Sequence, residues 1–597
     1  MKEAGNIGIN AENIFPIVKK FLYSNEEVFL RELISNSVDA TQKLKYLSSI
    51  NKHDDEIGDF KIKISINKEL KTITFSDNGL GMTKDEVKKY INQVAFSGAK
   101  DFLEKNKNNN KSDIIGFFGL GFYSAFMVSN KVEIITKSYQ KNSEAVLWEC
   151  IGTTSYKINK SDKKNIGTDV ILHISEDSEK FLEENEINTL LNKYCKFLPI
   201  PIEFNNVIIN NILPIWNLAS ANLKDKDYIK FYKELYPLND DPIFWIHLNV
   251  DYPFNLKGIL YFPKIKDDFD QHKNQIKIYS KQVFITDEVK EIVPDFLILL
   301  HGIIDSSEIP LNVSRSSLQV DKNVKKINNY IVKKVADKLE ELFTKDRKNY
   351  ENKWEDIESF IKYGMITNIK FYDKFKNFFL FKNLNNKYFT IEEYKLKIKD
   401  EQIDKDNNLV ILYTKEQKKQ NNYIKSCLNK NYDIIKFENS IDNHLINFLE
   451  SKFEKIKIKN IDSDIADKLI DKNIKINNFL SANQKKNLID IYKKTIQNKN
   501  INFSIMSMNS EDMSLIITIP ELMARMQSFQ NSNNLPVQFN AVINENHPLS
   551  IKILNIKNKE LQAKYIIQSY DLAMISKNML NGDQLTNFFN RSMEFIL

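Results

Sequence analysis

The sequence is poor in cysteine and has no long apolar run. Its three cysteines, Cys150, Cys195 and Cys427, are far apart and have no His partners at metal-ligand spacing, a pattern typical of buried thiols in a reducing compartment. The longest apolar run, near 296–300, is far too short to cross a bilayer. The first residues also lack the pattern of a signal peptide. We therefore expect a cytoplasmic protein with no membrane partner.

The chain also lacks a strong charge of either sign. Its 85 basic and 79 acidic side chains leave a net charge of +6, and no long basic run stands out. This balance argues against a dedicated nucleic-acid binder, so we expect no nucleic-acid partner. Almost all basic residues are Lys, which makes each of the few arginines worth inspecting: Arg31, Arg315, Arg347, Arg525 and Arg591.

Glycine is scarce as well, with 15 residues in 597, and its distribution is uneven. Six glycines fall between residues 79 and 121: Gly79, Gly81, Gly98, Gly116, Gly119 and Gly121. Glycine is needed where the backbone takes a positive φ or approaches another group closely. The cluster therefore indicates one compact site, and a phosphate-bearing ligand is the ligand class that it favours.

The length of 597 residues exceeds a single hydrophobic core. Hydrophobic periodicity predicts helix over 12–50 and alternating strands at 61–66 and 71–76, with further strands at 131–137, 144–150 and 168–174. Together they predict an α/β (α+β) sandwich, with a mainly antiparallel sheet, that ends near residue 205. A second α/β region begins near Trp216, residues 400–480 show helical periods, and the last part mixes strands with helices. We predict three domains, at 1–205, 212–478 and 485–597.

The first segment with site chemistry is Phe29–Ala40, FLRELISNSVDA. On a helix, Glu32, Asn36 and Asp39 project from one face, while Phe29, Leu33 and Val38 lie toward the core. A carboxylate one turn from a carboxamide suits a pair in which Glu32 polarises a water and Asn36 offers oxygen to a hard cation. A polar stripe on a surface helix is an equal alternative for this segment alone.

The second segment, Ser76–Met82 (SDNGLGM), directly follows a predicted strand. Asp77 at the strand end can accept a hydrogen bond from an exocyclic amine, and the glycines leave room for a planar ring. An Asp-Asn-Gly hairpin turn is the commoner meaning of this tripeptide alone.

The third segment, Gly116–Phe126 (GFFGLGFYSAF), runs from Gly-Leu-Gly into an apolar helical stretch. Free backbone N–H groups at a helix start favour anions. The absence of a following Lys-Ser/Thr excludes a Walker P-loop, and no short strand leads in as a Rossmann motif requires.

The order of these segments, with the polar loop Lys105–Ser112 between them, is more specific than any one of them. It resembles the Bergerat ATP-binding fold, shared by DNA gyrase B, MutL and sensor histidine kinases. FLRELISN, SDNGLGM and GFYSAF together resemble the heat-shock protein 90 chaperones, in their bacterial branch. The likeness extends to 277–288 and 302–319 of a middle domain and to 543–549 of a C-terminal dimerisation domain.

The resemblance implies a role for each matching residue. Glu32 would activate the hydrolytic water, Asn36 would bind Mg²⁺, and Arg315 would reach the γ-phosphate of ATP. Asp77 would read the adenine amino group with support from Thr168, while Asn312 and Gln319 would flank Arg315. Further nucleotide contacts are implied for Asp39, Gly81, Met82, Gly119, Leu120, Gly121 and Phe122.

Several positions depart from the family pattern. Phe96 and Phe117 replace a Lys and a Gln that help to hold phosphate, and Ser316 replaces a Glu after the implied catalytic Arg. Asn92 and Ala99 replace a Gly and a Thr near the loop Lys105–Ser112, which the resemblance implies is part of a lid over the site. Since each lost polar contact is worth about 1–3 kcal/mol, we predict weaker ATP binding or slower hydrolysis than is usual for the family.

The resemblance thus implies an ATP- and Mg²⁺-dependent homodimeric chaperone that binds non-native client proteins and could meet other chaperones. An ATP-binding holdase with little hydrolysis is the alternative. An ATPase of DNA repair or topology is a second one, for which the sequence shows no basic groove. A Met-rich stretch at 513–529, with Met506 and Met508 before it, is interpreted as helix core or as a client surface.

Overall fold

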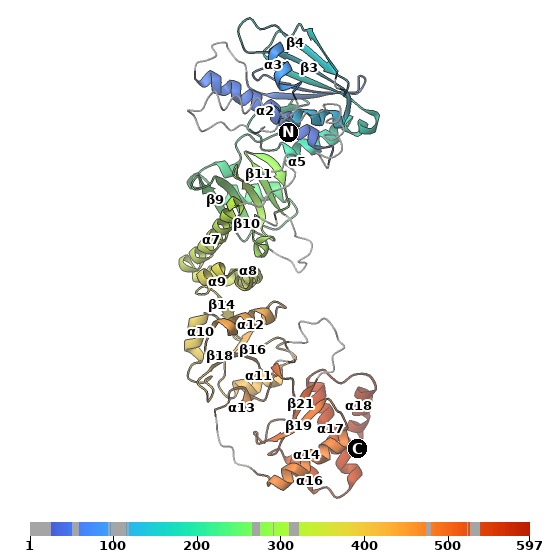
Figure 1. The fold of residues 1–597 in the computed structure, drawn as a ribbon. Coiled ribbons are helices and arrows are strands. Elements are labelled where there is room, and N and C mark those ends of the chain that lie inside the picture. The colour runs from blue at the N-terminus through green and yellow to red at the C-terminus, as the bar shows by residue number, and fades with distance from the viewer. Residues whose placement is uncertain are drawn as a thin grey trace, which may run out of the picture. The chain divides into compact units, whose positions relative to one another are not determined.

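The computed structural model describes residues 25–50, 59–93, 96, 115, 119–153, 155–264, 275–289, 292–309, 322–472, 479–521, 523, 525 and 538–597. The chain forms two compact units, Met1–Val335 and Ala336–Leu597 (Figure 1). Helix α7, Lys322–Lys345, contributes residues to both. The division into three domains remains a prediction.

The first unit contains an eight-stranded sheet in the order β5-β4-β3-β6-β2-β1-β7-β8. Its pairs are antiparallel except for β1 and β7, which run parallel. The five predicted strands are confirmed, whereas β5, β7 and β8 were not predicted. The strands are β1 (Ile62–Asn67), β2 (Thr72–Asp77), β3 (Ser129–Lys137), β4 (Val146–Cys150), β5 (Tyr156–Lys160), β6 (Gly167–Ile174), β7 (Ile202–Phe204) and β8 (Val207–Ile208).

Helix α2, Val28–Ser49, packs against this sheet at β2. Phe29, Leu33 and Val38 are buried in the core, as predicted from their spacing. The aromatic ring of Phe29 contacts the edges of Phe75 and Phe181 at centroid distances of 6.3 and 5.0 Å. The other helices of this region are α3 (Lys84–Tyr90), the 3-10 helices η3 (Gly121–Met127) and η4 (Glu176–Leu182), and α5 (Glu184–Tyr194).

A five-stranded sheet, in the order β12-β11-β13-β10-β9, forms the rest of the first unit. Trp216 is buried and shares one hydrophobic core with residues of both sheets, so it is a core residue. The elements are η5 (Ile215–Asn217), η6 (Ser220–Asn222), α6 (Asp225–Leu235), β9 (Phe244–Val250), β10 (Leu256–Phe262), β11 (Ile276–Ser280), β12 (Val283–Thr286), η7 (Asp295–Leu297) and β13 (His301–Asp305).

The second unit begins with helices and a parallel three-stranded sheet, β17-β16-β18. The helical interpretation of 400–480 was therefore incomplete, because buried strands alternate with the helices there. The elements are α8 (Arg347–Thr367), α9 (Ile369–Phe375), β14 (Leu380–Lys382), β15 (Tyr388–Thr390), α10 (Ile391–Ile398), β16 (Leu409–Thr414), α11 (Asn421–Leu428), β17 (Ile434–Lys436), α12 (Asp442–Lys452), β18 (Ile456–Asn460) and α13 (Ala466–Leu469).

The C-terminal part of this unit surrounds a sheet in the order β19-β21-β20. The Met-rich stretch is not one helix: Met506 ends a strand, Met508 is buried, and 515–518 is a strand. None of the helices in the described ranges has the length and hydropathy needed to span a bilayer. The elements are α14 (Ala482–Ile496), β19 (Ile501–Met506), β20 (Leu515–Thr518), β21 (Phe539–Asn544), α16 (Pro548–Asn555), α17 (Lys559–Ser576) and α18 (Gly582–Ile596).

Candidate functional site

Helix α2 carries the three polar residues predicted to share a face. Glu32 and Asp39 are buried, whereas Asn36, one turn after Glu32, is exposed. The fold thus places one buried carboxylate beside one accessible carboxamide. The three residues therefore do not form a uniformly solvated stripe.

The two oxygens of Glu32 have different surroundings. Oε1 accepts hydrogen bonds from Arg31 Nη2 at 3.0 Å and from Arg31 Nε at 3.3 Å. Oε2 faces Gly121, where a Cβ atom would lie only 2.5 Å from it. Glu32 is therefore oriented by Arg31 toward the Gly-Leu-Gly segment. Sequence reasoning assigned Arg31 no role, although its rarity and its position beside Glu32 were signals.

Asp77 ends β2, and its buried carboxylate Oδ1 accepts a hydrogen bond from the Gly79 N–H at 2.9 Å. Burial is the largest cause that raises the pKa of Asp77 to about 7, and hydrogen bonds from Gly79 and Ser37 oppose it. The alternative interpretation of this segment, an Asp-Asn-Gly hairpin turn, is not what the structure shows. The sequence after Asp77 leads instead to α3, while β2 pairs with β6 and β1.

Thr168 lies opposite Asp77 in the β2–β6 ladder. Its hydroxyl lies 3.0 Å from that of Thr136 on β3, and Thr136 Oγ1 accepts a hydrogen bond from the Met82 N–H at 2.9 Å. The structure thus links Thr168 and Met82 through Thr136, which sequence reasoning missed, and places Asp77 opposite Thr168. No motif marks Thr136, because only strand register places it there.

Two glycines, Gly81 and Gly167, allow close contacts between main-chain segments near Asp77. Gly81 has φ +59°, and a Cβ there would lie 1.8 Å from the Lys137 carbonyl oxygen. Gly167 has φ +121°, and a Cβ there would lie 2.1 Å from the Asp77 carbonyl oxygen. Side chains at either position would collide with backbone rather than with movable groups.

The Gly119–Phe122 segment leads into η3, which packs on α2. A Cβ at Gly119 would lie 2.6 Å from backbone atoms of Phe96. Asp39 Oδ1 accepts a hydrogen bond from the Ile115 N–H at 2.6 Å, so this carboxylate anchors the chain just before the glycine segment. The Phe122 ring meets the edge of Trp148 at a centroid distance of 5.7 Å.

Of the positions that depart from the family pattern, Phe96 and Asn92 lie within the described residues. The Phe96 ring stacks on Tyr90 with centroids 6.1 Å apart, and Lys89 Nζ lies 5.1 Å from its centre. Asn92 Oδ1 accepts a hydrogen bond from Trp148 Nε1 at 2.9 Å. The predicted residues that lie outside the described residues are Gly98, Ala99, the loop Lys105–Ser112, Gly116, Phe117, Asn312, Arg315, Ser316 and Gln319.

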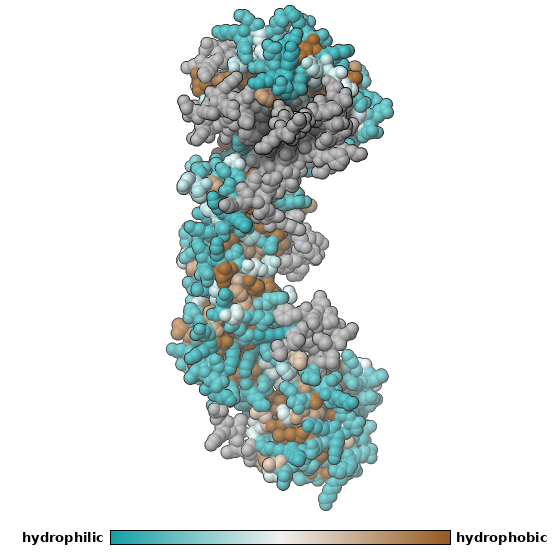
Figure 2. Space-filling model, in the orientation of Figure 1, coloured by the Kyte–Doolittle hydropathy of each residue, from teal (hydrophilic) through white to brown (hydrophobic). Residues whose placement is uncertain are grey.

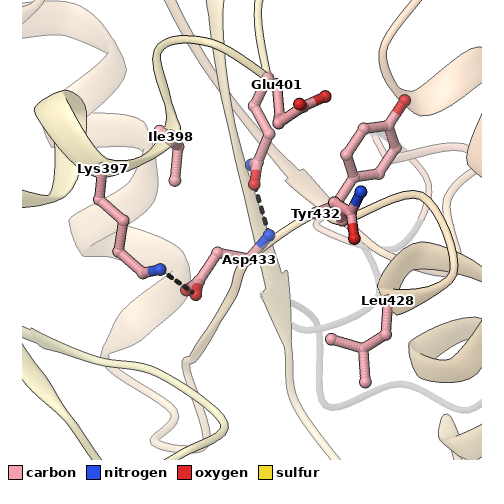
Figure 3. A pocket seen from close by; sticks show the side chains of 8 residues that line it. Lys397, Ile398, Glu401, Leu428, Tyr432 and Asp433 are labelled. Carbon is pink, nitrogen blue, oxygen red and sulfur yellow. Dashed lines mark hydrogen bonds and ion pairs between the residues drawn. The ribbon is translucent and has the colours of Figure 1, made fainter.

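A cavity of about 250 Å³ in the second unit is lined by residues of α10, α11 and the loops beside them (Figure 3). Three of its polar residues contact one another, since Lys397 Nζ lies 3.0 Å from Asp433 Oδ2 and Gln402 Oε1 accepts a hydrogen bond from the Asp433 N–H at 2.6 Å. None of the predicted site residues lines it. The glycine-rich site on α2 and β2 is therefore the stronger candidate.

Comparisons with known proteins show which family the chain resembles. Residues 203–576 match the model of the Hsp90 protein family, and residues 23–184 match that of the histidine kinase-, DNA gyrase B- and HSP90-like ATPases.

Three relatives span nearly the whole chain. Chaperone protein htpG of Bacteroides fragilis strain YCH46 is 43% identical, with 100% of both chains covered. Chaperone protein HtpG of Porphyromonas gingivalis strain W83 is 44% identical over 94% of this chain and 86% of its own. That of Wigglesworthia glossinidia brevipalpis is 31% identical over 96% of this chain and 95% of its own. The chain therefore belongs to the Hsp90 family of ATP-dependent chaperones.

Proposed function

We propose that ATP binds between α2, the end of β2 and the Gly119–Phe122 segment, with Glu32 as the general base for hydrolysis. The adenine amino group donates to Asp77, Thr168 and Met82 border the base, and the Gly119–Phe122 backbone receives the phosphates. The observation that supports this best is the placement of Glu32 Oε2 against Gly121, while Arg31 holds Oε1.

Asn36 is the proposed protein ligand of Mg²⁺. Its side chain is exposed one turn from Glu32, and Mg²⁺ needs few protein ligands because waters and substrate phosphates complete its shell. The described residues contain no cluster of three or more His, Cys, Asp or Glu that could hold a metal, which fits a cation that arrives with the nucleotide. When bound, Mg²⁺ neutralises phosphate charge. Glu32 would then accept a proton from the attacking water.

Arg315, with Asn312 and Gln319, is proposed to complete the site at the γ-phosphate. A guanidinium pairs bidentately with phosphate oxygens and stabilises charge that develops during phosphoryl transfer. Asp39 acts as an anchor for the chain at Ile115, on the evidence of its hydrogen bond.

We also propose a cytoplasmic homodimer that binds non-native clients. The apolar side chains of α18 support the dimer, because Phe589, Met593 and Ile596 repeat at helical spacing and are 58%, 56% and 77% exposed. The holdase alternative is not favoured, since the matched N-terminal model describes an ATPase.

The test is ATP turnover of the wild type beside Glu32→Ala, with ATP binding measured on both. We expect Glu32→Ala to bind ATP but to lose nearly all hydrolysis. Glu69→Ala, on the exposed turn between β1 and β2, is the control and should turn over ATP normally. Equal rates for the wild type and Glu32→Ala would refute the proposed base.

A further inference from the structure

Ser37 of α2 is a polar side chain in the interior of the first unit. Hydrophilic residues cover most of the described surface that Figure 2 shows, whereas Ser37 is buried. Buried hydroxyl groups are costly unless they form hydrogen bonds. The sequence motifs do not indicate a partner for Ser37, so the partner has to come from an element that packs on the helix.

The side of α2 that carries Ser37 contacts the turn after β2. Ala40 and Thr41, three and four positions after Ser37, lie on the same side of the helix. The Leu80 N–H of the turn donates to the Ala40 carbonyl at 3.2 Å. A Cβ at Gly79 would lie 2.6 Å from the Ala40 carbonyl carbon, so the turn lies directly against the helix.

Asp77 begins this turn, and its carboxylate accepts a hydrogen bond from the Ser37 hydroxyl. Asp77 Oδ1 also accepts the Gly79 N–H at 2.9 Å. A hydroxyl and an amide N–H therefore converge on one carboxyl group. An ionised carboxylate only accepts hydrogen bonds, whereas the protonated form carries a proton that needs an acceptor of its own. The two donors thus favour the ionised form of Asp77.

Burial favours the protonated form, and it is the largest cause that raises the pKa of Asp77 to about 7. Two charged groups also act on this carboxyl, since Asp169 of β6 raises its pKa and Lys163 lowers it. These two pair with each other, with Nζ 2.6 Å from Oδ2, so their effects partly offset. The residues opposite Asp77 on the neighbouring strands, Ile62 and Thr168, carry no charge. The balance between the two forms therefore lies near neutral pH, where one hydrogen bond changes it.

We propose that Ser37 is a positioning residue for adenine recognition, which holds the Asp77 carboxylate ionised and oriented for the amino group of ATP. This role rests on the contact proposed between Asp77 and adenine. Ser37 itself touches no nucleotide in this arrangement. Adenine brings a third donor to the same carboxyl, so the form that Ser37 stabilises is the form that ATP requires.

The test measures the Kd for ATP of full-length Ser37→Ala between pH 6 and pH 9. Loss of one hydrogen bond to a charged group should raise the pH midpoint of binding by about one unit. At pH 7 the Kd should therefore rise by about fivefold, whereas at pH 9 it should stay within about twofold of the wild type. The kcat at saturating ATP should change by less than about twofold, because the substitution leaves Glu32 and Gly121 in place.

Ser35→Ala is the matched control, because it removes a buried hydroxyl from the same helix. Ser35 Oγ has no hydrogen-bond partner in the part of the chain that the structure describes. Its Kd and pH midpoint should equal those of the wild type. The control nucleotide is purine riboside triphosphate, which lacks the 6-amino group. Its Kd should not rise in Ser37→Ala.

Unfolding of the unliganded protein tests the same hydrogen bond without ATP. The folded chain keeps a proton on Asp77 up to its pKa of about 7, so the stability that this proton contributes falls as the pH rises to that value and then levels off. In Ser37→Ala the fall should continue for about one more pH unit. The urea midpoint of Ser37→Ala relative to Ser35→Ala, followed from pH 6 to pH 9, measures this difference.

Ala is a better helix former than Ser, so Ser37→Ala should fold. If it does not, Ser37→Cys takes its place, because a thiol keeps the size of the side chain but donates weakly. An equal loss of ATP affinity at pH 7 and pH 9, an equal loss for both nucleotides, or an unchanged pH midpoint would each overturn the role of Ser37.

Asp77→Asn separates these results from a failure of the proposed site. If Asp77→Asn binds ATP as tightly as the wild type does, adenine does not meet Asp77, and both the proposed contact and the role of Ser37 are wrong. If Asp77→Asn is impaired and Ser37→Ala is not, the nucleotide site stands and only the role of Ser37 is refuted.

Discussion

Arg31 and Glu32 are sequence neighbours that form a buried ion pair, with Nη2 3.0 Å from Oε1. Both side chains are almost inaccessible to solvent, at 2% and 8% exposure. Adjacent residues on a helix do not normally face each other. The ion pair orients Glu32: Oε1 is bound by Arg31, and Oε2 faces Gly121.

Removal of the cation should destabilise the first unit. Arg31→Met would leave the Glu32 carboxylate buried without its charged neighbour, and breaking a buried pair in this way costs about 3–5 kcal/mol. Urea unfolding should show a lower midpoint. Lys61→Met, which breaks the exposed pair with Glu203, should change stability by less than about 1 kcal/mol. Equal midpoints for Arg31→Met and Lys61→Met would contradict this prediction.

Gly121→Ala should damage the reaction more than the fold. Its Cβ would lie 2.5 Å from Glu32 Oε2, and a flexible carboxylate can move away. We expect ATP turnover to fall by at least about tenfold at nearly unchanged stability. Gly79→Ala is the contrast, because its Cβ would meet backbone atoms of Ala40 and Thr41 at 2.6 and 2.7 Å. Gly79→Ala should therefore lower the melting temperature in thermal unfolding. If Gly121→Ala destabilises the protein more than Gly79→Ala does, the proposed geometry is wrong.

ATP affinity should depend on pH through Asp77. The carboxyl must be ionised to accept from the adenine amine, and its pKa of about 7 means that protons compete below neutrality. Calorimetric titration should show affinity falling by about tenfold per pH unit below pH 7. Asp77→Asn should bind weakly without this dependence. A wild-type affinity that stays constant from pH 6 to pH 8 would exclude the mechanism.

The same shift has an opposite consequence for the stability of the unliganded protein. Between the usual pKa of 3.8 and the folded value of about 7, the folded chain retains a proton that the unfolded chain releases. The contribution of Asp77 is therefore fully present below about pH 4 and is lost as the pH rises through 7.

Phe96→Lys should strengthen ATP binding. The substitution introduces the cation that the resemblance implies at this position, and one such contact is worth about 1–3 kcal/mol. We expect the Kd for ATP to fall by about fivefold or more, moderated by repulsion from nearby Lys89. Phe96→Met, which adds no charge, is the control. If Phe96→Lys binds ATP no better than Phe96→Met, the prediction that Phe96 weakens ATP binding is wrong.

Charge on the apolar side of α18 should separate the proposed dimer. Phe589→Asp/Met593→Asp would place two carboxylates on exposed positions that the dimer would bury. Sedimentation should then show monomers at micromolar concentrations, while the fold stays intact. Asn590→Asp, an exposed polar neighbour, should leave association unchanged. A dimeric double variant would refute this interface.

Sequence periodicity located the elements that carry the site but missed others. Strand β1 alternates buried and exposed residues, and β2 alternates buried and half-buried residues over most of its length. Both strands were predicted within one residue. Strand β5 has almost no buried side chain, and β8 has only two residues, both exposed, so neither shows an alternating pattern. In 400–480 the short apolar strand β16 is buried among Lys- and Asn-rich helices, which dominated the periodicity.

The sequence indicated which residues belong to the candidate site, but it did not indicate which side chains contact one another there. The motifs indicated Glu32 and Asp77, yet the orientation of Glu32 depends on Arg31, and the surroundings of Thr168 depend on Thr136. Both contacts arise from side-chain geometry or strand register, which linear spacing does not encode. The hydrogen bond from Ser37 to Asp77 joins two separate motifs, and no local pattern predicts it.

Gly81 and Gly167 have a consequence for how this chain can change over time. Each is packed against a carbonyl oxygen of a paired strand, so no larger residue fits without movement of the main chain. Genetic drift can therefore alter the pocket only at the side chains around this fixed framework. If ATP binds here as proposed, substitutions of side chains can change its affinity, whereas the main-chain framework at Gly81 and Gly167 stays fixed.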